Sequence, residues 1–187
     1  MSIFSFGQPD GGICQLGFIV KDVRAAIEHN LKTFGVGPWF FMEKVEISNA
    51  TYHGRPMEFV GSMACANTGH MMIELIQQHN EAPSIFTEVI KSKGYGLHHQ
   101  AVVVRDFPAK IKAYEAMGYE TVFYCETGMP NRVAYVDTKG ASPFFIEVIE
   151  AAGMLEAVFN GVYRASVDWD GMNPIRDFVS YDQLTGS

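Results

Sequence analysis

The sequence predicts an α+β fold made of two tandem βαβββ modules. The first observation is an internal repeat, because residues 12–22 follow the same plan as residues 96–106, with Val20 and Asp22 recurring 84 positions later. The second is that each copy opens with an apolar run typical of a strand and continues into helical spacing. The third is that three short apolar runs, separated by turn residues, follow each helix.

The first module begins with the apolar run 13–20, which predicts a strand. Asp22 is the expected N-cap of the following helix, in which apolar residues recur at helical spacing. Gly35, Gly37 and Pro38 are expected to end that helix. Three further segments rich in apolar residues are predicted to be strands: 39–47, 57–66 and 71–76. The hairpin-type loop and the tight turn between them are placed at 48–56 and 67–69.

The second module repeats this order after a linker. Ser84 is expected to cap a short helix over 85–91. Pro108 fits the first turn of the helix after Asp106, which ends at Gly118. The predicted strands of this module are 97–104, 119–125, 132–138 and 144–149, with turns at 128–130 and 139–140. The chain is treated as one unit, 1–187, with modules at 12–78 and 95–150, a linker at 79–94, and a C-terminal helix (154–163) and tail within 151–187.

Composition narrows the function classes. The chain has 187 residues, of which 48% are hydrophobic, with a formal net charge of −7 and a pI near 5.3. This acidic balance argues against a nucleic-acid-binding surface, which needs a basic stripe. Neither a membrane-spanning apolar run nor a secretory signal is visible. Cys14, Cys65 and Cys125 are odd in number and widely spaced, which indicates a reducing, cytoplasmic location rather than a disulfide framework.

Polar residues inside apolar strands mark a candidate metal site. Gln15 and His99 stand at equivalent places on the first strand of each module, and Glu74 and Glu147 lie in apolar runs on the last strands. Ionised carboxylates are seldom placed in such runs unless they are paired or bind a metal. Each residue alone also fits a core polar group or an edge-strand carboxylate that faces water. Four equivalent placements in a repeat favour a shared site.

His98 directly precedes His99, so the alternation of side chains along a strand predicts that the two rings point to opposite faces of the sheet. We assign the ligand role to His99, because its spacing to Val104 equals the spacing of Gln15 to Val20. His98 is instead expected to pack under a helix.

The chain resembles the vicinal oxygen chelate superfamily over about residues 12–150. Paired βαβββ units with metal ligands on the first and last strands are the pattern of that superfamily, which includes glyoxalase I, methylmalonyl-CoA epimerase, extradiol dioxygenases and the fosfomycin and bleomycin resistance proteins. The segment 96–99 is most similar to the epimerases, and 36–39 resembles a glyoxalase-like subgroup. The ligand order Gln, Glu, His, Glu is similar to eukaryotic glyoxalase I, whereas epimerases usually have His first and Gln second. The resemblance implies a curved, half-barrel mixed sheet around a central cleft.

The resemblance also implies a metalloenzyme. Gln15, Glu74, His99 and Glu147 would hold one divalent ion, Zn²⁺, Ni²⁺, Co²⁺ or Mn²⁺, in an oxygen-rich shell. The implied activity is that of an isomerase, epimerase or lyase, which removes the proton next to a carbonyl of a small apolar or thioester-type substrate through a metal-bound enolate. Glu147 would act as the base, with Glu74 as its counterpart across the metal.

Several aromatic and polar side chains are predicted to contact that substrate. The main candidates are Trp39, His53, Arg55 and Phe123. Further candidates for the apolar wall are Phe41, Phe59, Met63 and Phe144. Arg55 or Arg132 would hold an acidic group of the substrate. The loop that contains His53 has no second acidic residue to match the non-metal acid or base of the epimerases, which argues against acyl-CoA epimerisation.

Two other functions are compatible with parts of this pattern. An extradiol dioxygenase needs two histidines and one carboxylate on iron, whereas Gln15 replaces one histidine here and a second carboxylate is present. A non-catalytic small-molecule-binding protein of the same fold would need no metal and would tolerate loss of Glu147. In each case the expected partner is a small molecule, not a nucleic acid or a membrane, and a homodimer is expected.

Overall fold

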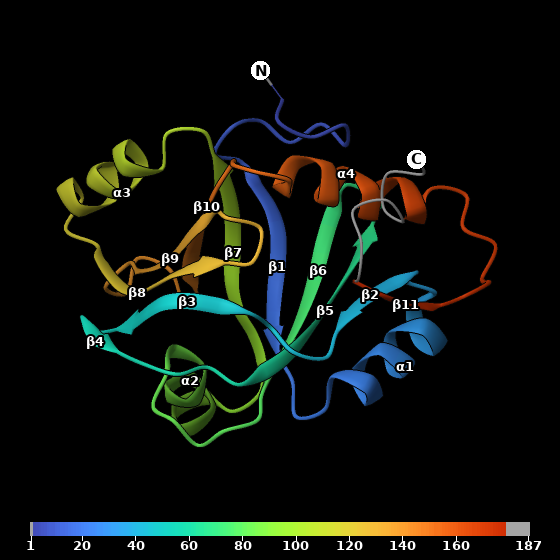
Figure 1. Ribbon diagram of the computed structural model, residues 1–187, viewed down its shortest axis with the longest axis horizontal. Coiled ribbons are helices and arrows are strands. Elements are labelled where there is room, and N and C mark those ends of the chain that lie inside the picture. Colours follow the sequence, from blue (N-terminus) through green and yellow to red (C-terminus); the bar gives the residue numbers. More distant parts are fainter. Residues whose placement is uncertain (1, 179–187) are drawn as a thin grey trace.

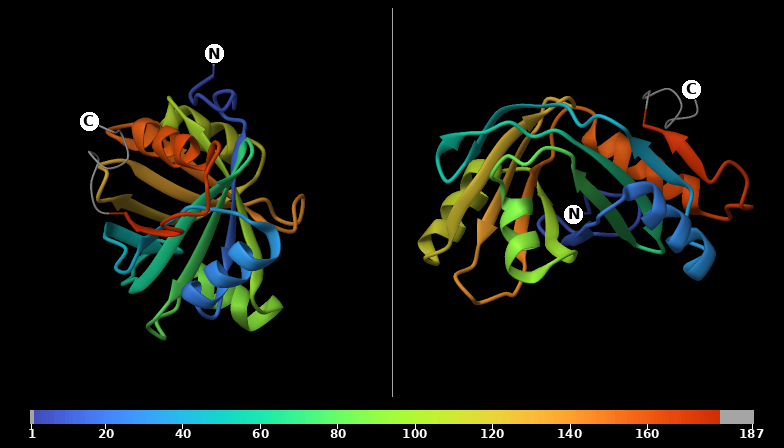
Figure 2. Two further views of the ribbon diagram at one scale, coloured as in Figure 1. Left: turned by 90° about the vertical axis from the view of Figure 1, so that its right-hand side faces the viewer. Right: turned by 90° about the horizontal axis from the view of Figure 1, so that it is seen from below.

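The predicted α+β fold is confirmed by a computed structural model, which describes residues 2–178. Within these residues, one mixed sheet of eleven strands forms a curved, open surface (Figures 1 and 2). The strand order is β11-β2-β5-β6-β1-β7-β10-β9-β8-β3-β4. The two modules therefore meet at β1 and β7, in the middle of the sheet.

The bounds of the elements follow the order of the chain. The first part contributes β1 (Ile13–Ile19), α1 (Val23–Phe34), β2 (Trp39–Met42), β3 (Ile47–Tyr52), β4 (Arg55–Pro56), β5 (Gly61–Thr68) and β6 (Met71–Gln78). The linker contains α2 (Ile85–Lys93). The second part contributes β7 (Gly96–Val104), α3 (Phe107–Ala116), β8 (Glu120–Thr127), β9 (Arg132–Asp137) and β10 (Phe145–Glu150), and is followed by α4 (Leu155–Ser166) and β11 (Ile175–Asp177).

The pairing of the central strands brings the two ends of each module together. β1 is parallel to β6 on one side and antiparallel to β7 on the other, and β7 is parallel to β10. Gly17 is in register with both Glu74 on β6 and His99 on β7. Glu147 on β10 is in register with Ala101, two residues along β7 from His99. The predicted ligands therefore lie on four adjacent strands.

Two equivalent helices cover one face of the sheet, at opposite ends of the molecule (Figure 1). Asp22 caps α1 by accepting a hydrogen bond from the N–H of Ala25, and Asp106 caps α3 in the same way with Ala109. The buried cluster under α1 consists of Val23, Ile27, Trp39, Phe41, Ala64, Ala66 and Leu75. The cluster under α3 consists of Val102, Val104, Phe107, Ala134, Val136 and Val148.

The other face packs against α2, α4 and the N-terminal arm. Ser84 caps α2, and its side chain and that of Thr87 form a reciprocal capping box. The arm covers α4 through aromatic contacts: Phe4 stacks on Phe159, with ring centroids 5.3 Å apart, and Phe6 lies 5.2 Å from Tyr163. Apolar side chains of these segments therefore cover this face of the sheet.

The predicted strand boundaries between α1 and β6 are partly wrong. The strand predicted over 39–47 ends at Met42, and the strand predicted over 57–66 begins only at Gly61. Residues 47–52, predicted as part of a strand end and loop, form β3, which pairs antiparallel with β8 of the second module. Because this partner is distant in the sequence and β3 is polar and partly exposed, no local pattern indicated the pairing.

The C-terminal helix begins and ends near its predicted bounds, at Leu155 and Ser166. The tail after it, for which no structure was predicted, contains β11, which pairs in parallel with β2 at the sheet edge. Residues 179–187 of the predicted tail lie outside the described residues. Among the described helices, none has the length and hydropathy needed to cross a membrane.

Candidate metal centre

The fold brings one imidazole and two carboxylates into contact. His99 on β7 is fully buried, and its Nε2 lies 3.3 Å from Oε2 of Glu74 and 3.1 Å from Oε2 of Glu147. One ligand atom from each of the three residues falls within 4.8 Å of the others. This spacing suits three protein ligands around one divalent ion.

Gly17 makes room for the imidazole. A Cβ atom built at this position would lie 1.8 Å from Cε1 and 2.1 Å from Nε2 of His99. Both distances are far below any van der Waals contact, so the ring occupies the space in which another residue would place its side chain. The absence of a side chain at Gly17 thus positions His99 between Glu74 and Glu147.

Gln15 completes the set on β1. Its Nε2 lies 3.6 Å from the Met72 sulfur and 4.0 Å from the Cys65 sulfur. Each predicted ligand carries one buried polar atom without a hydrogen-bond partner among the described residues: Gln15 Oε1, Glu74 Oε2, His99 Nε2 and Glu147 Oε2. Buried polar atoms normally have partners. His99 Nε2 contacts Glu74 Oε2 and Glu147 Oε2 as charged neighbours, and a bound cation would give these three atoms and Gln15 Oε1 a common partner. The donor set, three oxygens and one nitrogen, suits a first-row divalent metal.

The charged groups of this cluster shift one another's pKa. Burial raises the pKa of the Glu74 carboxyl, against the lowering effect of His99, and the charge of Glu147 adds to the rise. Burial disfavours a charge on His99, but Glu147 and Glu74 outweigh it and raise the pKa of the ring to about 9. Without a metal, the cluster therefore holds a proton on His99 at neutral pH, which a metal ion has to displace.

His98 does not point to the opposite face of the sheet, and this corrects the expectation from strand alternation. Its Nδ1 lies 3.0 Å from Nδ1 of His99, and both rings contact Tyr135, with centroids 5.6 and 5.1 Å away. Alternation fails because the pairing of β1 with β7 shifts in register at this point. His98 packs against Phe86 of α2, and burial, followed by the nearby His99, holds its pKa well below the usual value.

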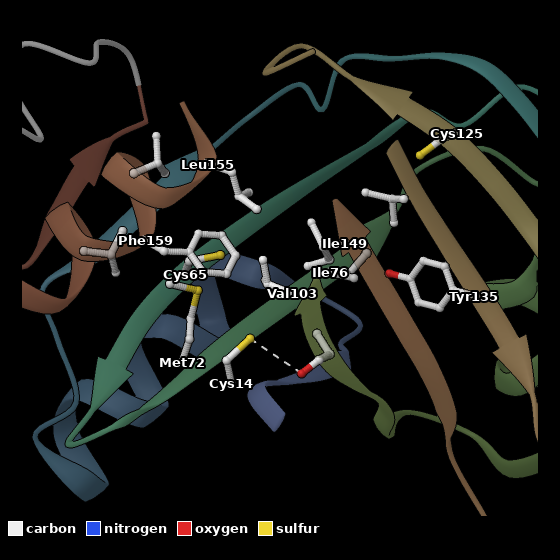
Figure 3. Packing of buried hydrophobic residues seen from close by; sticks show 14 of the residues in the cluster. Cys14, Cys65, Met72, Ile76, Val103, Cys125, Tyr135, Ile149, Leu155 and Phe159 are labelled. Carbon is white, nitrogen blue, oxygen red and sulfur yellow. Dashed lines mark hydrogen bonds between the residues drawn. The ribbon is translucent and has the colours of Figure 1, made fainter. Parts of the chain in front are cut away.

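A cavity of about 600 Å³ adjoins the ligand cluster. Gln15, Glu74 and Glu147 contribute to its lining, and most of the remaining wall is apolar. Figure 3 shows Leu155 and Phe159 of α4 facing the sheet residues that carry this wall. The wall also includes Phe59, Met63, Cys65, Ile76, Phe123, Cys125, Val133 and Ile149. A concave apolar site with a few convergent polar groups is typical of a small-molecule site.

Of the predicted substrate-binding residues, Phe123 lines this cavity. Trp39 lies elsewhere, which corrects the prediction. It is fully buried in the cluster under α1, and its indole N–H donates to the carbonyl of Val36 at 2.8 Å. Phe41 belongs to the same cluster. The rings of Trp39 and Phe41 form the apolar part of β2 that packs against helix α1.

His53 and Arg55 lie at the β3–β4 turn and do not line the cavity. His53 approaches Glu88 and Glu120 at 3.9 and 3.8 Å, so its contacts join the turn to α2 and β8. The turn belongs to a hairpin at the sheet edge, so the position of this cavity does not support the predicted contacts of His53 and Arg55 with a substrate. Arg132 is also removed from the cavity, because its Nε donates to Glu150 at 2.7 Å.

Tyr135 is a site residue that was not predicted from the sequence. This side chain lines the cavity and is in register with Glu147 across the β9–β10 pair. Burial, followed by the charges of Glu147 and Glu74, holds its pKa well above the usual value, so the phenol stays protonated. Counting residues across the predicted turn at 139–140 would have placed Arg132 opposite Glu147. The observed register pairs Glu147 with Tyr135, so the predicted turn did not indicate this residue.

Fold and site together define a paired βαβββ protein with a candidate metal centre between its modules. The sequence profile of the Glyoxalase/Bleomycin resistance protein/Dioxygenase superfamily matches residues 14–135. The chain belongs to this superfamily. No curated protein sequence matches the chain significantly.

Solved structures with the same fold include three informative ones. A hypothetical protein from Bacillus halodurans is 17% identical with a TM-score of 0.58, covering 76% of this chain and 95% of that one. A Streptomyces coelicolor methylmalonyl-CoA epimerase variant in complex with 2-nitronate-propionyl-CoA is 18% identical, with a TM-score of 0.56 and coverages of 76% and 95%. The epimerase from Mycobacterium tuberculosis is 20% identical, with a TM-score of 0.54 and coverages of 79% and 91%. At these identities the likeness concerns the fold.

Proposed function

We propose that this protein is a metal-dependent isomerase, epimerase or lyase, which removes a proton next to a carbonyl group of a small apolar or thioester-type substrate. The observation that carries the proposal is the cluster of Glu74, His99 and Glu147 beside an apolar cavity, with one unpartnered polar atom on each residue. Such a cluster is costly to bury unless a cation occupies it. The named epimerases of the same fold act on carbonyl compounds of the thioester type, which is consistent with this class.

The metal would be held by His99 and Glu74 with Gln15 and Glu147. Zn²⁺, Ni²⁺, Co²⁺ and Mn²⁺ all suit this donor set. When bound, such an ion supplies Lewis-acid stabilisation of negative charge on a carbonyl oxygen. Glu74, His99 and Glu147 each already offer one ligand atom within 4.8 Å of the others, and Gln15 lines the same cavity with an unpartnered Oε1.

Glu147 is the proposed base. Its carboxylate is almost fully buried, lines the cavity, and is thus open to a substrate on one side only. Most of the cavity wall around this carboxylate is apolar, and a general base must lie within hydrogen-bond reach of the proton that it removes. The phenol of Tyr135 beside it stays protonated and can donate a hydrogen bond. Glu74 on the other side of His99 is the proposed counterpart that returns the proton.

The dioxygenase alternative is disfavoured by the position of the second histidine. His98 packs against α2, and its Nδ1 contacts Nδ1 of His99, the ring nitrogen that does not face the carboxylates. The cluster therefore offers one imidazole and two carboxylates. Iron sites of the extradiol type require two histidines and one carboxylate. A binding protein without catalysis is the remaining alternative, and the next experiment separates it from an enzyme.

The experiment follows the exchange of the substrate's α-hydrogen with deuterium from solvent, using a panel of thioesters and hemithioacetals. Glu147→Gln keeps the shape of the side chain but cannot accept a proton at neutral pH. We expect exchange to fall by at least about a hundredfold, the lower end of general-base contributions. Glu156→Gln, an exposed change on α4, is the control and should have no effect. Wild-type exchange that survives in metal-loaded Glu147→Gln would refute the assigned base, and its absence in the wild type would favour a binding protein.

A further inference from the structure

Asn131 is a buried polar residue in the lining of the cavity and is not part of the metal cluster. Asn131 precedes β9, below the turn that joins β8 to β9, and is 2% exposed. It contributes to the cavity lining, among mostly apolar neighbours such as Met129 and Val133. An amide in such a position is expected to have a defined hydrogen-bond partner for each of its polar atoms.

Only one side of this amide is engaged within the described residues. Thr127 Oγ1 accepts the backbone N–H of Met129 at 3.1 Å, so its own hydrogen is free to donate, and it donates to Asn131 Oδ1. The backbone N–H of Thr127 also donates to the carbonyl of Asn131 at 3.0 Å. These bonds fix the orientation of the side chain. Asn131 Nδ2 is buried and left without a partner among residues 2–178, so it is the polar atom of this cavity-lining side chain that the protein leaves unbonded.

The register of β9 separates this donor from the proposed base. Tyr135 is in register with Glu147, and Asn131 lies four residues before Tyr135, directly before the first residue of β9. Four residues of an extended strand span about 13 Å. The lining between the two points, Phe123, Val133 and Ile149, is apolar. Asn131 and Glu147 are therefore two separate polar points in the cavity lining, and apolar residues also line this cavity.

Charge restricts what can bind Asn131. Of the cationic residues, only Lys44 lines the cavity, and it is exposed, next to the exposed Glu46. Arg132, the nearest cation in sequence, is paired with Glu150. A buried anion facing one amide would remain largely uncompensated. The acceptor that fits Asn131 is therefore uncharged, such as a carbonyl, ether or hydroxyl oxygen.

We propose that Asn131 is a specificity-determining residue, which binds an uncharged oxygen at the distal end of an elongated substrate whose reactive carbonyl lies beside Glu147. This inference rests on the proposed function for the position of the reactive end. It names the substrate class more closely: a mostly apolar chain with a carbonyl at one end and a neutral acceptor at the other.

The test uses two ketones that differ at one position, 2-undecanone and undecane-2,10-dione, titrated into the purified protein by calorimetry. The ratio of their dissociation constants reports on the second carbonyl alone. Asn131→Leu has a similar shape but no hydrogen-bond donor. In this variant we expect the affinity for the diketone to fall about tenfold more than the affinity for 2-undecanone, because the second carbonyl of the diketone loses its hydrogen bond. Ile149→Val is the control: it thins the apolar wall and should weaken both ligands alike.

A ratio that is unchanged in folded Asn131→Leu would overturn the proposal. If that variant fails to fold, Thr127→Val provides the second measurement, because it releases Asn131 Oδ1 from its anchor and lets the amide rotate. We expect a shift in the same direction, and an unchanged ratio would again contradict the inference. Neither titration depends on turnover, so a failure of the proposed chemistry appears separately as missing deuterium exchange.

Discussion

At the scale of single residues, two adjacent histidines have different roles. His99 faces both carboxylates, whereas His98 packs against Phe86. We expect His99→Ala to lower metal affinity by at least about tenfold, since a lost ligand leaves the shell incomplete. His98→Ala should instead lower the free energy of unfolding, because it removes a buried ring. Metal titration and urea denaturation of both variants check this, and the opposite pattern would mean that the ligand has been assigned to the wrong ring.

Protonation of His99 predicts how metal binding depends on pH. The ring has a pKa of about 9 in the metal-free protein, so it is protonated at neutral pH and must lose its proton to bind a metal. Binding at neutral pH should therefore release at least one proton, and affinity should rise as the pH is raised toward 9. Calorimetry in buffers with different ionisation enthalpies measures the release. Binding without proton release would contradict this charge state.

A repeat marks the four candidate ligands in the sequence, whereas no repeat marks Tyr135 or Asn131. Gln15 and His99 occupy matching positions, and Glu74 and Glu147 interrupt apolar runs. The role of Asn131 depends on which of its atoms Thr127 engages, which is a matter of side-chain geometry. Trp39 was predicted to contact the substrate but lies under α1, because an aromatic residue in a strand can face either the cavity or a helix.

At the scale of elements, the contact of β1 with β7 positions the site. Gly17→Ala would place a methyl group where the His99 ring lies, so we expect the ring to move and metal affinity to fall, with a loss of stability of about 1–3 kcal/mol from overpacking. Gly128→Ala is the matched control, because its added methyl meets nothing closer than 3.9 Å. Metal titration and thermal unfolding compare the two. Normal metal binding in Gly17→Ala would show that the close approach is not required.

Elements with local signals were predicted well, and those defined by distant partners were not. Asp22 and Ser84 cap their helices as expected, because a cap is determined by a few neighbouring residues. Asp106, after which the second long helix was predicted to begin, caps α3 in the same way. β3 and β11 depend on β8 and β2, which are remote in the sequence. Their own sequences are short or polar, so only the tertiary structure makes them strands.

At the scale of the whole molecule, the repeat accounts for the architecture. In an isolated module, the edge of β1 or of β7 that faces the other module would have no hydrogen-bonded neighbour. The antiparallel pairing of β1 with β7 joins the two modules into one sheet. The same pairing collects the ligands of both modules around His99. A homodimer and a cytoplasmic location stay predictions from the sequence, and sedimentation of the purified protein would test the first.

The measurement that tests the central claim most directly is the metal content of the purified protein after mild dialysis, determined by mass spectrometry. The cluster of Glu74, His99 and Glu147, with Gln15 beside it, predicts about one divalent ion per chain. A protein that is isolated without metal, and that also fails to take up Zn²⁺, Ni²⁺, Co²⁺ or Mn²⁺, would contradict it.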